Sequence, residues 1–264
     1  WDWACVRNIG VKLAFGGQLS GSRIVKIASG WYLAVAQFED SGLVVWYGRQ
    51  STTKEQFETE NYDSVPLYTI IPGTQGTVVD FMAGSDYVLF IKEDGLLYRY
   101  SINAHDSWQT GVPQGSLFAM TGFNKWLKIH NEGYSTGHGC KFSKLSGCFN
   151  SFAVFTDDGL VLLGENSGDL ETKEPEVKEE LQKRKICHVA MGDYHHLALT
   201  DDGELLAWGR ESKQCGCLGV GPLELDEIVT KPRTVNKPSS SGKWLAVAAA
   251  GWHSCAIFSE ELED

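Results

Sequence analysis

The sequence predicts an all-β fold of the propeller class, because one strand, glycine, strand, turn and strand pattern recurs five times along the 264 residues. In each copy an apolar strand ends at a first glycine, and in four copies a second glycine follows 11 or 12 residues later. Successive first glycines lie 54, 63, 45 and 59 residues apart. Because the interior of the repeat has a fixed length while the connectors vary, we predict blades of about 50 residues. The first glycines are Gly30, Gly84, Gly147, Gly192 and Gly251, and the second are Gly42, Gly95, Gly159 and Gly203.

The repeats begin near residues 24, 78, 142, 186 and 245, and we assign all of 1–264 to a single propeller domain. Residues 1–23 precede the first repeat and fit a connector, or an outer strand of an earlier or of the closing blade. The fifth repeat has no third strand of its own after its glycine. A propeller commonly completes such a blade with strands from the other terminus, so we expect N-terminal strands there.

The connectors carry weaker signals. Residues 49–77 are polar and acidic, and the divergent stretch 103–141 contains short apolar runs in which we expect strands and loops. Residues 175–183 fit a short helical turn that packs Val177 and Leu181 against a blade, although an interaction helix is the alternative.

Glycine chemistry gives two local predictions. The Glu93-Asp94-Gly95 segment favours a type I′ hairpin turn, in which both central residues have positive φ. Gly192 is expected to have positive φ, or to lie where a β-carbon would not fit.

Composition argues against several classes of partner. Lys+Arg 23 against Asp+Glu 34 gives a net charge of −11, which disfavours a nucleic-acid partner. No stretch is long and apolar enough to cross a membrane, and we expect no signal peptide. The seven cysteines are odd in number and irregularly spaced, which indicates a reduced protein of the cytoplasm or nucleus without a disulfide framework.

We find no pattern typical of an enzyme, a cofactor site or a metal site. No glycine-rich loop precedes a helix with Lys-Ser/Thr, and no Gly-x-Ser-x-Gly elbow is present. His253-Ser254-Cys255 places nucleophile and base types side by side, but neighbours on a strand point to opposite faces. The close Cys/His pairs are Cys215-Gly-Cys217, His138-Gly-Cys140 and His195-His196, and they lack the paired spacing of structural zinc sites.

Aromatic and imidazole side chains cluster just after the first glycines. Packing between blades explains more than half of them, and the alternative is a rim of anchors for a partner protein. The candidates for protein binding are Trp31, Tyr87, Phe149, Tyr194, His195 and Trp252. The connectors are a second candidate surface.

The fourth repeat resembles that of the RCC1 superfamily. Gly192-Asp-Tyr-His-His-Leu-Ala-Leu-Thr-Asp-Asp-Gly203, continued to Gly209, matches it almost position by position, and Gly216-Cys-Leu-Gly219 stands where that family has Gly-Gln-Leu-Gly. The resemblance implies an RCC1-like β-propeller. The family's propellers classically have seven blades, so the five visible repeats fit either part of such a ring or a smaller closed one.

A narrower resemblance comes from Val78-Val-Asp-Phe-Met-Ala-Gly84, Gly147-Cys-Phe-Asn-Ser-Phe152 and Met191-Gly-Asp-Tyr-His195. These look like fungal proteins with an F-box before RCC1-type repeats, the SCF-associated factor family. It implies substrate recognition within an SCF ubiquitin ligase, a protein substrate to be ubiquitinated, and Skp1 bound through an F-box that we expect upstream of Trp1. The alternative is an RCC1-type guanine-nucleotide exchange factor or regulator of a small GTPase; a hydrolase on a propeller scaffold is the third.

Overall fold

The computed structural model describes residues 15, 17–31, 33–47, 67–103, 110–133, 139–211, 215–224 and 227–260. The chain divides into two compact units. The N-terminal unit comprises residues 1–93 and 98–119, and the C-terminal unit comprises 94–97 and 120–264. The one-domain assignment therefore stays a prediction.

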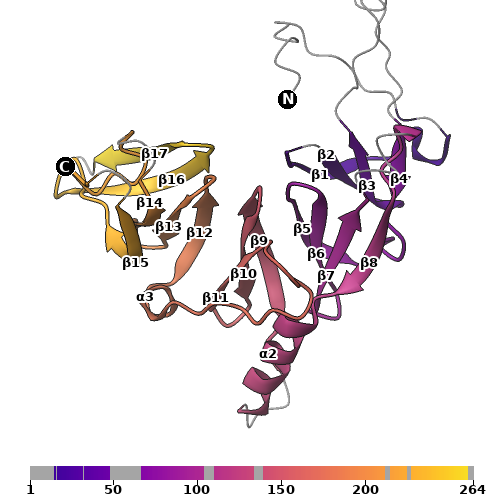
Figure 1. Cartoon of the computed structure of the whole chain (residues 1–264), viewed down its shortest axis with the longest axis horizontal. Coiled ribbons are helices and arrows are strands. Elements are labelled where there is room, and N and C mark those ends of the chain that lie inside the picture. The colour runs from indigo at the N-terminus through magenta and orange to yellow at the C-terminus, as the bar shows by residue number, and fades with distance from the viewer. Residues whose placement is uncertain are drawn as a thin grey trace, which may run out of the picture. The chain divides into compact units, whose positions relative to one another are not determined.

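The N-terminal unit contains two four-stranded antiparallel sheets, preceded by the short 3-10 helix η1 (Gly17–Leu19). In each sheet the strands follow in chain order (Figure 1). The first has β1 (Ile24–Ser29), β2 (Leu33–Phe38), β3 (Gly42–Tyr47) and β4 (Tyr68–Ile70), and the second has β5 (Val78–Ala83), β6 (Tyr87–Lys92), β7 (Leu97–Ile102) and β8 (Gly115–Ala119). The fourth strands β4 and β8 come from the connectors, so a blade is larger than the three-strand repeat.

The C-terminal unit contains three antiparallel sheets of three, four and two strands. They are β9 (Phe142–Cys148), β10 (Ser151–Thr156) and β11 (Val161–Glu165); then β12 (Ile186–Met191), β13 (His195–Thr200), β14 (Leu205–Arg210) and β15 (Ile228–Thr234); then β16 (Gly242–Ala250) and β17 (His253–Glu260). The first strand of each sheet lies next to the first strand of the following sheet, β9 beside β12 and β12 beside β16. In the N-terminal unit β1 lies beside β5 in the same way.

Helix α2 (Thr121–Glu132) corrects the prediction of only strands and loops for 103–141. Strand β8 confirms the strands expected there, but the next segment has apolar residues spaced for one helix face. Phe123 and Leu127 are buried on that face, and the ring of Phe123 lies 5.4 Å from that of Phe152. The sequence hid this helix because Gly122, Asn124 and Ile129 are mediocre helix formers.

Helix α3 (Glu179–Gln182) confirms the short helical turn. Leu181 is fully buried as predicted, but Val177 is 43% exposed, so its predicted packing is wrong. Leu181 packs into the hydrophobic core of the C-terminal unit.

The second glycines lie in hairpin turns, where their φ angles run from 77° to 93°. The type I′ prediction is wrong, because a type I′ turn needs positive φ at both central residues and Gly95 has positive φ whereas Asp94 does not. The fourth repeat shows the geometry fully: the Gly203 amide donates to Thr200 O (3.2 Å) and the Thr200 amide to Glu204 O (2.9 Å). This is a turn of type I followed by a left-handed glycine, which closes a three-residue hairpin loop.

Three of the first glycines, Gly30, Gly84 and Gly192, lie where a β-carbon would not fit, whereas Gly251 has a φ of 55° and open space beside it. Gly192 does not have positive φ, so that part of the prediction is wrong. A β-carbon there would lie 2.2 Å from Cε1 of His195 and 2.7 Å from Gly251 O, which confirms the close approach. In the N-terminal unit a β-carbon on Gly30 would lie 1.9 Å from Gly84 O. The backbone amides beside these glycines link neighbouring sheets: Asp193 donates to Gly251 O (2.9 Å) and Trp31 to Gly84 O (3.3 Å).

Within the described residues the third sheet has three strands, and other groups cover its outer edge. The side-chain amide of Gln182 accepts from Val161 N (2.9 Å) and donates to Val161 O (2.8 Å). Two residues along, Leu163 and Glu176 exchange both backbone hydrogen bonds at 2.9 Å. Exposed strand edges invite pairing with other chains, and here a side chain and a single bridge satisfy this edge.

Gly192→Ala should destabilise the C-terminal unit by about 1–3 kcal/mol, because the added methyl group overlaps the His195 ring and the Gly251 carbonyl. Urea unfolding would measure this. The matched control is Gly133→Ala, whose β-carbon would meet its nearest neighbour at 3.5 Å. Equal midpoints for the two variants would show that close approach does not govern Gly192.

Gln182→Ala should expose the backbone amide of Val161 and cost about 1–3 kcal/mol, the order expected when the two hydrogen bonds to Val161 and the one to Lys178 O are lost at a partly buried site. Hydrogen exchange at Val161 should accelerate strongly while exchange at Leu163, held by Glu176, changes little. Unchanged protection at Val161 would contradict the assigned role.

Candidate binding surface

The structure separates the six predicted binding residues by burial. Trp31, Tyr194 and Trp252 are exposed at 44%, 55% and 43%. Tyr87 and His195 are fully buried, so they belong to the core and do not offer a surface to a partner. Phe149 is half-buried in the turn between β9 and β10 and has a φ of 54°.

Distance from the first glycine explains this sorting. Side chains one or two residues after the glycine, such as Trp252 and Tyr194, lie in the turn and point outward. Side chains three residues after it fold back over the glycine: the rings of Tyr87 and His195 fill the space where a β-carbon of Gly84 or Gly192 would stand. The sequence pattern mixed the two classes because it did not distinguish these steps.

Tyr194 lies at a hollow of about 640 Å³ in the C-terminal unit. Residues of strands β10 to β15, the segment 170–178 and helix α2 line it. The aromatic lining residues are Phe123, Phe152, Tyr194 and Trp208. Sequence reasoning found Tyr194 but missed the hollow, because its walls come from segments up to about 100 residues apart.

The charged residues at the hollow are mainly acidic. The four acids are Glu165, Glu174, Glu176 and Asp193, and the two lysines are Lys173 and Lys178. Lys178 binds Glu176 (2.7 Å), and Glu174 accepts from Lys125 (3.2 Å). Glu165 and Asp193 form no ion pair among the residues that the structure describes, so the hollow keeps an excess of negative charge.

Two adjacent histidines, His195 and His196, follow Tyr194 at the start of β13. His196 lines the hollow beside Trp208, with ring centres 5.2 Å apart, and its Nδ1 is buried without a hydrogen bond among the described residues. Burial, followed by the neighbouring His195 and Lys178, lowers the pKa of His196 to about 4. Burial also lowers the pKa of His195.

His195 and Ser254 meet at 2.7 Å, between His195 Nε2 and the Ser254 hydroxyl. The pair connects β13 with β17, so the serine of His253-Ser254-Cys255 has a partner 59 residues away that the local sequence did not reveal. Because His195 is fully buried, a substrate has no access to it, and the contact serves packing between the two sheets.

Two clusters among the described residues bring together side chains of types that can bind a metal ion. In the first, Glu211, Cys215 and Cys217, the buried carboxylate of Glu211 accepts the amides of Gly216 (2.6 Å), Cys217 (3.2 Å) and Leu218 (3.3 Å). These bonds use both oxygens and explain the cluster as the organiser of a turn.

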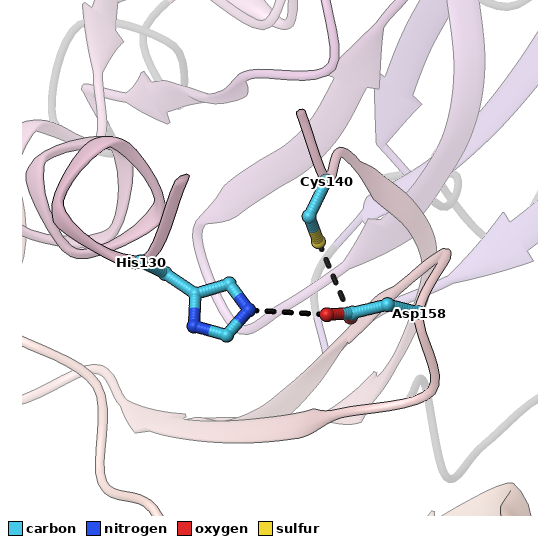
Figure 2. Close-up of side chains that lie close together, drawn as sticks. All are labelled: His130, Cys140 and Asp158. Atoms are coloured by element: carbon cyan, nitrogen blue, oxygen red, sulfur yellow. Dashed lines mark hydrogen bonds and ion pairs between the residues drawn. The ribbon is translucent and has the colours of Figure 1, made fainter. Parts of the chain in front are cut away.

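The second cluster consists of His130, Cys140 and Asp158 (Figure 2). The predicted neighbour His138 lies outside the described residues, as does Cys5. Asp158 instead joins Cys140 from the next hairpin, and His130 joins from α2. The six cysteines from Cys140 to Cys255 are free thiols. None of the helices in the described ranges is long and apolar enough to span a bilayer.

Comparisons with known proteins agree with this architecture. The family model described as "Regulator of chromosome condensation (RCC1) repeat" matches residues 186–217 and, in a second form, 202–257. The chain is 31% identical to SCF-associated factor 1 of Saccharomyces cerevisiae over 97% of its length and 38% of that protein's. It is 39% identical to F-box protein pof9 of Schizosaccharomyces pombe over 43% of its length and 27% of that protein's. The chain thus spans less than half of each of these relatives.

A solved structure shows the fold. The chain superposes on Prp20p from Saccharomyces cerevisiae with a TM-score of 0.60 and 15% identity, over 93% of this chain and 57% of that one. Together with the repeated four-stranded antiparallel sheets, this match makes the fold an all-β, RCC1-like propeller.

The C-terminal unit should lose stability in acid because of His196. Above pH 6.5 the imidazole is neutral in both the folded and the unfolded chain. Between pH 6.5 and about pH 4 it is protonated in the unfolded chain but stays neutral in the folded chain. The loss between these values should reach at most about 3 kcal/mol. Urea midpoints at pH 7.5 and 4.5 would measure it, and His196→Gln should show a smaller acid loss. An equal loss in both proteins would rule out this source.

Proposed function

We propose that this chain, an RCC1-like repeat protein, forms the substrate-recognition part of an SCF ubiquitin ligase adaptor. The single observation that carries this proposal is the 31% identity to SCF-associated factor 1, because it extends over 97% of the chain. The second relative is named as an F-box protein. In this family the resemblance implies that the F-box binds Skp1 and the repeats bind the substrate, so Skp1 would be bound through an F-box that these 264 residues do not provide.

The proposed role needs binding and no chemistry from the chain itself. Exposed aromatic side chains bring large contact area at low entropic cost, which makes Tyr194 a suitable anchor. The acidic groups Glu165 and Asp193 beside it favour a substrate segment with lysine or arginine side chains. Trp31, Phe149 and Trp252 are further candidate contacts. We place the adaptor in the cytoplasm, the nucleus or both.

A second candidate function is guanine-nucleotide exchange on a small GTPase. It is favoured by 25% identity to Protein RCC1 of Candida albicans over 85% of this chain and 39% of that protein. Prp20p, which shares the fold, is described as having binding properties to Gsp1p and histones. The net charge of −11 disfavours binding to the DNA of a nucleosome. It does not bear on nucleotide exchange, so it does not decide between the two functions.

Tyr194→Ala and Glu165→Lys in the full-length gene product should reduce the recovery of substrate proteins at least tenfold, since a central aromatic anchor is commonly worth 2 kcal/mol or more. Affinity purification followed by quantitative mass spectrometry, with Skp1 measured in the same sample, would test this. The matched control is Ile129→Ser, an exposed apolar residue on α2 outside the hollow lining. Unchanged substrates in both variants would exclude the hollow, and absence of Skp1 from the wild-type sample would exclude the adaptor role.

Release of labelled GDP from a panel of small GTPases separates the two functions. The adaptor proposal predicts no acceleration by the purified full-length protein. Acceleration of tenfold or more on any member would establish the exchange function instead.

A further inference from the structure

We propose that His130, Cys140 and Asp158 form a zinc-binding site at the junction between helix α2 and the third sheet. Their ligand atoms all lie within 4.8 Å of one another. Figure 2 shows the imidazole and the thiol both directed at the carboxylate of Asp158. The His130 Nε2–H donates to Asp158 Oδ2 at 3.0 Å, and the Cys140 thiol donates to Oδ1 at 3.2 Å.

The donor set suits Zn²⁺ better than the hard cations. Imidazole nitrogen, thiolate sulfur and carboxylate oxygen are the three ligand types that zinc takes in proteins, whereas Mg²⁺ and Ca²⁺ prefer oxygen alone. Three protein ligands leave the fourth tetrahedral position for water. Cys140 is buried, but the His130 and Asp158 side chains are 26% and 25% exposed, which gives the ion and that water an entry path.

Neighbouring groups already hold each ligand in position. The side-chain amide of Asn131 accepts from Cys140 N (2.7 Å) and donates to Cys140 O (3.0 Å), so it fixes the backbone of that residue. The Trp126 ring stacks on His130 with centres 4.9 Å apart. The Thr156 hydroxyl donates to Asp158 Oδ1. Supporting contacts of this kind orient the ligands of metal sites.

The fourth sheet supplies an internal comparison. There, Thr200 donates to Asp202 in the equivalent turn, so the Thr-x-Asp contact alone is a feature of the hairpin. Asp202 belongs to no cluster of three metal-binding side chains among the described residues. In the third sheet, His130 and Cys140 also contact the carboxylate of the turn. The hairpin turn by itself does not account for these two contacts.

The same three residue types also occur in cysteine nucleophile triads, but their order here is wrong for one. In a triad the histidine contacts the thiol and the acid orients the histidine. Here Asp158 stands between the other two.

Binding follows a simple proton balance. Zn²⁺ takes the place of the thiol proton, which passes to solvent, and His130 coordinates through Nε2 while its remaining proton shifts to Nδ1. The ion would then replace the two hydrogen bonds to Asp158 and fasten the last turn of α2 to the β10–β11 hairpin.

Metal binding to the full 264-residue chain tests the proposal. One equivalent of Zn²⁺ should bind, and Co²⁺ should give the near-ultraviolet charge-transfer band of a cobalt thiolate. Cys140→Ser should abolish that band, and His130→Gln should weaken zinc affinity at least tenfold. Asp202→Asn and Cys187→Ser are matched controls for the turn carboxylate and for an exposed cysteine, and both should bind as the wild type does.

A readout on structure accompanies the affinity. Excess Zn²⁺ should raise the thermal midpoint of the wild type and of both controls, and raise that of His130→Gln, a variant at a partly exposed position, by clearly less. Absence of the cobalt band in a folded wild-type chain, or equal zinc affinity in the wild type and His130→Gln, would overturn the proposal.

Discussion

The structure depends on how closely the backbones of neighbouring sheets approach at two of the first glycines, Gly30 and Gly192. At Gly30 a carbonyl oxygen occupies the place of a β-carbon, and at Gly192 an imidazole ring and a carbonyl do so. The next amide donates across to the following sheet at Gly84 and Gly251. This contact sets the spacing between sheets, so any side chain there would separate them. Gly30 and Gly192 are therefore needed for reasons of space, whereas Gly251 and the second glycines have positive φ.

With that spacing fixed, the outer parts of the sheets are free to differ. Strands β4, β8 and β15 complete their sheets from connectors of different length. In the third sheet the described residues form no such strand. The side-chain amide of Gln182 and the bridge between Leu163 and Glu176 cover the outer edge of β11 instead. Since each solution satisfies the outward-facing backbone groups, the connectors can change without disturbing the inner strands. This freedom explains why the repeat spacing varies while its interior does not.

The surface features arise where these variable parts meet the constant ones. The hollow beside Tyr194 lies between the constant turn after Gly192 and the connector that covers the third sheet. The cluster of His130, Cys140 and Asp158 joins a constant hairpin to the inserted helix α2. In both places a common scaffold carries residues specific to this chain, which is the usual division of labour between a fold and its sites.

The sequence by itself determined the repeat, the strands around each first glycine and the positions of the glycine turns. These follow from local periodicity and from the conformations that glycine alone adopts, so no distant contact was needed to predict them. Only the tertiary structure decided that Tyr87 and His195 are buried while Tyr194 is exposed, that α2 is a helix, and that Ser254 meets His195. Each of these depends on packing between segments far apart in the chain, where the burial of a face or the space beside a glycine overrides local preference.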